Sequence, residues 1–106
     1  MLWTSLPERA GPFFEVLHTT PRTQTAFMTI APGEEAGPTE VHETQDQVIY
    51  VVRGEILARV GGGSTPKEVR GGPGSLLVIE AGTPHWVKSV GKEPLLFLTV
   101  YGPPAY

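Results

Sequence analysis

Short apolar runs separated by proline and glycine dominate the pattern of this chain. The runs are rich in β-branched and aromatic residues, and most are too short for a helix of typical length. The turns between them are marked by 11 prolines and 13 glycines in 106 residues. The pattern predicts seven strands, at residues 13–17, 25–30, 47–52, 55–60, 75–80, 85–90 and 94–101. Seven short strands favour an all-β sandwich or barrel.

Alternation within HWVKSV predicts which side chains of that strand share a face. His85, Val87 and Ser89 lie on one face, and Trp86 and Lys88 lie on the other. The runs VIYVV, LLVI and LLFL do not alternate, which is typical of strands covered on both faces. A protein of this size can cover a second face by pairing with another copy, so a homodimer is expected.

The remaining segments are interpreted as connections and ends. The glycine-rich stretch 61–74 is predicted to be a flexible connection at a hairpin tip. The alternative, a phosphate-binding loop, lacks the helix and the Lys-Ser/Thr pair that such a loop needs. Residues 1–23 are predicted to form an arm and edge strand packing on the barrel or on a partner, 24–101 the barrel, and 102–106 a tail.

Composition narrows the chemistry. The net charge is −3 and no stretch gathers lysine and arginine, so nucleic acid is not an expected partner. No basic leader and no apolar run of roughly 20 residues is present, which predicts a cytoplasmic protein without a membrane span. The chain has no cysteine, so any metal must be bound by nitrogen and oxygen. The lack of asparagine and the 11 prolines indicate a thermophilic source.

Polar side chains gather in TEVHETQDQVIYVVRG, at residues 39–54. Glu40 and His42 are two residues apart and project from one face of extended backbone. Gln47 opens the apolar strand, and a four-residue loop can return it beside His42. The simpler interpretation is a solvated loop ahead of a strand, with Glu40 and Asp46 as surface acids.

A second histidine, His85, follows the turn at 81–84 far along the chain and completes a candidate set of metal ligands. Two histidines with one carboxylate and open positions are typical of non-haem iron and related divalent ions. The alternatives are a core histidine at His85 bonded to backbone, and a Gln47 amide that binds water or ligand rather than metal. His18 has no partner in the sequence and is assigned an exposed role. The predicted ligands are Glu40, His42, Gln47 and His85.

These two blocks resemble the two signature motifs of the cupin superfamily. In the first motif, G-x5-H-x-H-x3-4-E-x6-G, counting back from Gly54 puts Gln47 at the glutamate position and His42 and Glu40 at the two histidines. In the second, G-x5-P-x-G-x2-H-x3-N, the matching positions are Gly74, Glu80, Gly82, His85 and Ser89. The resemblance covers about residues 24–101 and implies a double-stranded β-helix barrel, jelly-roll-like, with a metal pocket inside.

The departures from the motifs bear on function. The usual three histidines and one glutamate become Glu, His, Gln and His, which keeps one negative charge but adds an amide, a weaker ligand. The predicted cofactor is a divalent ion, Fe, Mn, Ni or Zn. The predicted activity is oxygenase or isomerase chemistry on a small molecule. The alternatives are a non-catalytic small-molecule binding module and a structural barrel with a vestigial site. The pocket-lining residues expected from parity are Met28 (or Phe27), Ile49, Val51, Val87 and Ser89.

Overall fold

The computed structural model describes residues 1–106 and contains eight strands and no helix. The strands are β1 (Phe14–Thr19), β2 (Gln24–Ile30), β3 (Asp46–Arg53), β4 (Ile56–Val60), β5 (Lys67–Gly71), β6 (Leu76–Ile79), β7 (His85–Ser89) and β8 (Leu95–Gly102). The all-β prediction is therefore confirmed. No helix capable of crossing a bilayer occurs.

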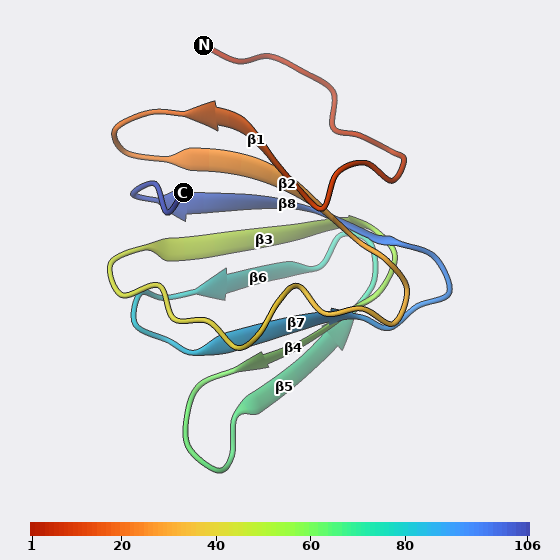
Figure 1. Ribbon diagram of the computed structural model, residues 1–106, viewed down its shortest axis with the longest axis vertical. Coiled ribbons are helices and arrows are strands. Elements are labelled where there is room, and N and C mark those ends of the chain that lie inside the picture. The colour runs from red at the N-terminus through yellow and green to blue at the C-terminus, as the bar shows by residue number, and fades with distance from the viewer.

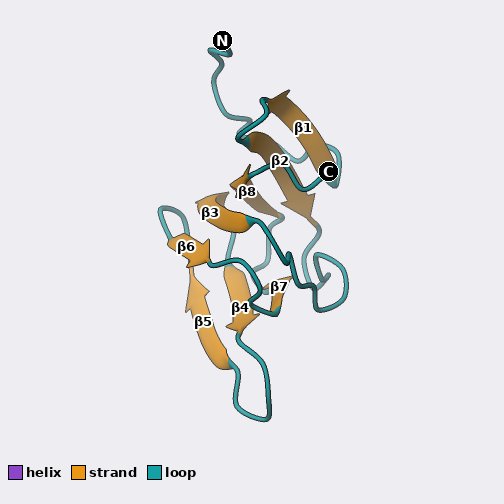
Figure 2. Cartoon of the chain, turned by 90° about the vertical axis from the view of Figure 1, so that its left-hand side faces the viewer, coloured by secondary structure: helices purple, strands orange, loops and turns teal.

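Two antiparallel sheets face each other and form a jelly-roll-like barrel (Figure 1). One sheet has the order β1-β2-β8-β3-β6, and the other has the order β5-β4-β7. On one side of the barrel the sheet edges β6 and β5 lie next to each other without pairing (Figure 2). The barrel is thus open along that seam.

A buried apolar cluster fills the space between the sheets. Both sheets contribute to it, and the residues on β7 follow the predicted alternation, since His85, Val87 and Ser89 are buried while Trp86 and Lys88 are half-buried. Burial of such side chains is the main favourable term in folding. The cluster consists of Met28, Ile30, Ile49, Val51, Ile56, Ala58, Ile79, Val87, Leu95 and Phe97.

One strand was missed by the sequence analysis. The stretch 61–74 is not only a connection, because β5 occupies Lys67–Gly71 and pairs with β4 along its whole length. Lys67, Glu68 and Arg70 are exposed, and Val69 is the only apolar side chain that packs on the core, so the stretch lacks the apolar alternation that reveals a strand. An exposed ion pair joins it to β4, with Arg59 Nε 2.9 Å from Glu68 Oε2.

The turn between β3 and β4 depends on Gly54. Its φ is +84°, a conformation that side chains disfavour. A Cβ atom there would lie 2.5 Å from the carbonyl oxygen of Pro94 and 2.8 Å from Cα of Leu95. This requirement explains why a glycine closes the first motif.

Candidate metal centre

Backbone pairing brings the two motif segments together. Residues 33–42, which connect β2 to β3, run along β7 as an irregular extra strand (Figure 1). Glu40 and His85 exchange both backbone hydrogen bonds, each with an N···O distance of 2.9 Å. The amide of Gly82 donates to the carbonyl of His42 at 2.8 Å. Directly opposed residues of an antiparallel pair project their side chains to the same face.

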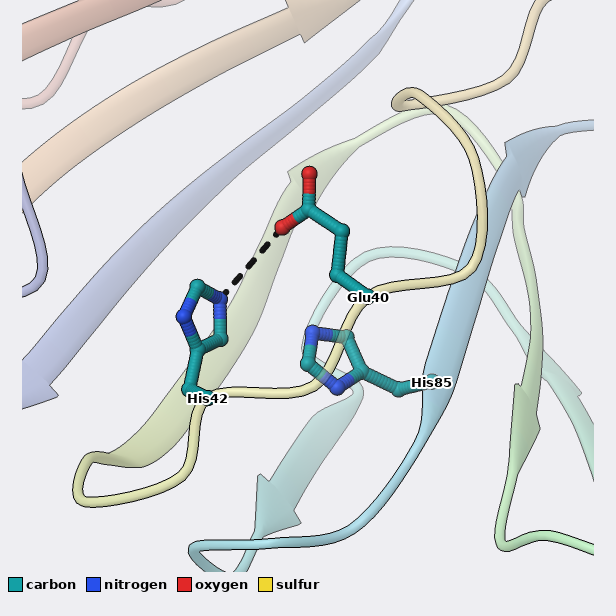
Figure 3. A group of neighbouring side chains, drawn as sticks. All are labelled: Glu40, His42 and His85. Carbon is teal, nitrogen blue, oxygen red and sulfur yellow. Dashed lines mark ion pairs between the residues drawn. The ribbon is translucent and has the colours of Figure 1, made fainter.

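Three of the four predicted ligands meet at this point. Donor atoms of Glu40, His42 and His85 all lie within 4.8 Å of one another, comparable with the span of about 4 Å across a single bound ion. Figure 3 shows Glu40 and His42 on the loop before β3 and His85 at the start of β7. The two imidazole centroids are 5.2 Å apart. The group combines two nitrogens with one carboxylate.

The hydrogen bond of His85 fixes its tautomer. Its Nδ1 lies 3.0 Å from the carbonyl oxygen of Thr83. A carbonyl only accepts, so Nδ1 carries the proton and Nε2 keeps its lone pair. A backbone carbonyl in this role is the usual support of a metal-binding imidazole.

His42 has a buried nitrogen without a hydrogen-bond partner. Its Nε2 lies 3.4 Å from Glu40 Oε2, which is within ion-pair range but lacks hydrogen-bond geometry. Burial lowers the pKa of His42, and the adjacent His85 lowers it further, against the opposing effect of Glu40. The imidazole is therefore neutral at pH 7. A buried, neutral, unpartnered nitrogen is suited to a cation.

Gln47 lies at the start of β3, and only the nitrogen of its side-chain amide is hydrogen-bonded. Its Nε2 donates to Thr99 Oγ1 at 3.0 Å and to the Tyr101 hydroxyl at 3.4 Å. Its Oε1 is buried and has no hydrogen-bond partner. Gln47 lines the same cavity as Glu40 and His85, so this orphaned oxygen belongs to the same polar end of the barrel. The donors present, with two unpartnered atoms among them, fit a divalent ion.

Comparison with known proteins agrees with this geometry. The family model described as the cupin domain matches residues 26–101. This chain is a cupin. No curated protein gives a significant match.

Solved structures resemble this cupin over most of its length. BH2720 from Bacillus halodurans is 31% identical with a TM-score of 0.84, covering 93% of this chain and 76% of that one. TT1209 from Thermus thermophilus is 30% identical with a TM-score of 0.75, covering 85% and 81%. Oxalate decarboxylase from Lactobacillus farciminis, solved as a formate complex, is 27% identical with a TM-score of 0.72 and covers 80% of this chain, but only 25% of that longer one.

A cavity of about 280 Å³ opens beside the three clustered ligands. Six of the 14 residues that line it are aromatic, and its only ionisable side chains are Glu40, His85 and two tyrosines. Burial and the neighbouring Tyr106 raise the pKa of Tyr101, and burial and Glu40 raise the pKa of Tyr106, so both phenols stay protonated. The aromatic wall consists of Phe13, Phe14, Trp86, Phe97, Tyr101 and Tyr106.

Not all of the residues expected to line the pocket do so. Met28, Ile49 and Val87 line this cavity. Val51 does not. It shares a face with Ile49 but lies two residues further along β3, where it lines a second cavity of about 300 Å³. Ser89 lines neither and is fully buried, with an unpartnered hydroxyl.

Three other predicted placements can be compared with the structure. Trp86 was predicted to lie on the face opposite His85, and its half-buried ring lies there, 4.6 Å from the guanidinium of the exposed Arg59. Trp86 also contributes to the lining of the cavity. Asp46 is exposed and accepts a hydrogen bond from the Ala81 amide at 2.9 Å. His18 was predicted to be exposed but is half-buried on β1, and it lies outside the ligand cluster.

Sequence reasoning did not identify Thr99, Tyr101 and Tyr106 as residues of the site. Parity along β8 was a usable signal, because Phe97, Thr99 and Tyr101 share one face and all three are buried. The uninterrupted run LLFL concealed that alternation. For Tyr106 the sequence held no signal, since its place depends on contacts with distant residues.

Proposed function

We propose that this cupin binds a divalent metal ion through Glu40, His42 and His85, with Gln47 as a fourth ligand, and holds a small molecule beside it. The observation that carries the proposal is the buried Nε2 of His42, which has no hydrogen-bond partner and lies among the other donors. An unpartnered buried polar atom is costly in a folded protein. A bound ion would remove that cost.

The types of donor atom narrow the choice of metal ion. Two imidazole nitrogens, one carboxylate and one amide oxygen suit Fe, Mn, Ni or Zn. When bound, such an ion supplies Lewis-acid or redox chemistry. Two of the side chains are oriented to bind it. The hydrogen bond from His85 Nδ1 to Thr83 leaves Nε2 free for the ion, and the hydrogen bond from Gln47 Nε2 to Thr99 leaves Oε1 free.

The cavity supports a small, oxygen-bearing ligand. Its wall contains no lysine or arginine, so an anionic group would depend on the ion for its counter-charge. The aromatic rings favour the apolar part of the ligand. Oxalate decarboxylase, a protein of similar fold, was solved with formate, a small carboxylate. Oxygenase or isomerase chemistry on such a molecule is the activity proposed.

A metal analysis tests the proposal. Protein purified without an affinity tag or chelator is expected to carry Fe, Mn, Ni or Zn close to one ion per chain, and His42→Ala to lose it. His18→Ala is the matched control, because this third histidine lies outside the cluster. Metal retained by His42→Ala, or absent from the wild type even after soaking, would overturn the proposal.

A second candidate is a non-catalytic barrel that binds a small molecule. It is favoured by the absence of a spare base, because every ionisable side chain lining the cavity is a proposed ligand or a protonated tyrosine. Proton-transfer chemistry needs a positioned group of suitable pKa. Bound ligand recovered unchanged after long incubation with metal-loaded protein would favour this candidate over the enzyme.

The outer face of the five-stranded sheet supports a homodimer. Leu76 and Val78 on the edge strand β6 are 66% and 56% exposed, and Tyr50, paired with Leu76, is 41% exposed. Exposed apolar patches of this kind are typical of interfaces. We propose that a second copy covers this face, with residues 1–12 packed or exchanged beside it. The mass in solution, measured by light scattering, is expected to be twice 11.4 kDa, and a monomer would contradict the proposal.

A further inference from the structure

The segment that follows β8 is fastened to the barrel by a buried glutamine. Gln24, at the start of β2, is 2% exposed. Its Nε2 donates to the carbonyl oxygen of Tyr106 at 2.6 Å, and its Oε1 accepts from the amides of Tyr106 and Ala105, at 2.8 and 3.2 Å. Both ends of one side-chain amide are therefore used on the same short piece of backbone.

Further contacts fix the ring of Tyr106. Gln45 Nε2 donates to the carbonyl oxygen of Pro104 at 3.1 Å, which ties the same segment to the loop that carries His42. The Tyr106 ring packs edge-on against Phe14 and Tyr101, with centroid distances of 5.1 and 5.4 Å. Its centroid is 5.9 Å from that of His42. Tyr106 is 62% exposed, and these contacts place its ring beside the ligand cluster.

The phenol at the end of this ring reaches a metal ligand directly. The Tyr106 hydroxyl donates to Glu40 Oε2 at 3.2 Å. The same oxygen faces Nε2 of His42 at 3.4 Å. The Glu40 side chain is 38% exposed and is otherwise free to choose among rotamers, unlike the two histidines that surround it. One hydrogen bond therefore selects the conformer in which the carboxylate faces the imidazoles.

We propose that Tyr106 is a positioning residue for Glu40, held in place by Gln24, and that it raises the affinity of the site by orienting this carboxylate before an ion binds. The inference rests on the proposed metal site. Groups that hydrogen-bond to metal ligands commonly change metal affinity by about 10- to 100-fold. A ring that only walls the cavity would not have this effect when its hydroxyl alone is removed.

Tyr106→Phe tests the inference, because it keeps the ring and its packing and removes only the donor. Co²⁺ is titrated into metal-free protein, and binding is followed by the visible absorption of the ion. The variant is expected to bind Co²⁺ about 10-fold more weakly and with altered absorption bands. Tyr50→Phe, which removes a phenol from the outer face, is the matched control and is expected to match the wild type.

A second measurement needs no metal. The carboxylate carbon of Glu40, labelled with ¹³C and assigned through Glu40→Gln, is expected to shift in Tyr106→Phe and to stay unchanged in Tyr50→Phe. Equal thermal unfolding of Tyr106→Phe and wild type shows that the fold is intact.

The outcomes separate the inference from the proposed function. Co²⁺ binding by the wild type with the same affinity and absorption bands in Tyr106→Phe would overturn the inference and leave the metal site standing. An unchanged Glu40 carbon signal in Tyr106→Phe would overturn the inference as well. Failure of the wild type to bind Co²⁺ at all would overturn both.

Discussion

The cupin barrel contains two cavities of similar size that share Ile49 as a wall and differ in their polar groups. The cavity beside the ligand cluster is lined by Gln47 and adjoins His42. Gln47 Oε1 and His42 Nε2 are both buried without a hydrogen-bond partner. The second cavity, of about 300 Å³, is walled mainly by aliphatic residues of β3 to β6. Its one charged side chain, Arg70, is paired with Glu55.

Volume alone therefore does not locate function in this molecule. At the aliphatic end, the polar side-chain atoms of the residues lining the second cavity are partnered or open to water, as an ordinary core requires, whereas the neighbouring Ser89 Oγ, opposite Ile56, is buried without a partner. At the other end, His42 Nε2 and Gln47 Oε1 are buried without partners, which lowers the stability of the folded protein. The difference supports the proposal that the ligand binds at the end beside His42 and Gln47.

Removing the shared wall should have the largest effect. Ile49→Ala is expected to destabilise the protein by about 2–5 kcal/mol, because Ile49 is 1% exposed, lines both cavities and would leave a void behind it. Urea unfolding measures the change. Val16→Ala, which truncates a 44% exposed side chain on β1, is the control and should stay within about 0.5 kcal/mol of the wild type. Equal effects of the two substitutions would contradict the packing role of Ile49.

Reciprocal exchanges of threonine and valine sharpen the comparison. Thr99→Val removes the closer of the two acceptors for Gln47 Nε2 and leaves the Tyr101 hydroxyl, and Val51→Thr places a hydroxyl at the aliphatic end. Each is expected to cost about 1–3 kcal/mol in urea unfolding. Only Thr99→Val is expected to weaken Co²⁺ binding as well, by about 10-fold, because the Gln47 amide is then held less firmly. A comparable loss of affinity in Val51→Thr would contradict the proposal that the ligand binds at the end beside Gln47.

The ion pair at the second cavity should matter least. Glu55→Gln weakens its contact with Arg70, which lies 2.6 Å away through Nη2, but both side chains are substantially exposed. The expected cost is about 0–1 kcal/mol, and smaller at high salt, because water and ions screen such pairs. Unfolding at two salt concentrations measures it. A cost above about 2 kcal/mol would show that the pair closes this end of the barrel.

Motif spacing predicted much of the ligand cluster. Counting residues from Gly54 and from Gly82 placed Glu40, His42 and His85 correctly relative to one another, because rigid strands turn sequence spacing into fixed geometry. The requirement for glycine at position 54 made that count reliable. Whether Gln47 binds the ion stays a prediction.

Other features had no local signal. β5 was missed because a strand with a single apolar side chain, Val69, carries no apolar period. Val51 was placed in the wrong cavity because parity gives the face of a side chain but not its depth along the barrel axis. Tyr106 could not be placed, since Gln24 and Gln45 act on it from distant parts of the chain.

The backbone pairing of Glu40 with His85 means that the proposed metal site forms only when the fold is complete. In an unfolded chain Glu40 and His42 remain neighbours, but His85 is brought back only by closing a long loop at an entropic cost. An ion held by all three would bind the native state selectively and stabilise it by about 2.7 kcal/mol at a free concentration 100 times its Kd. It would act as a removable cross-link between two distant parts of the chain, in a protein that has no cysteine with which to make a permanent one.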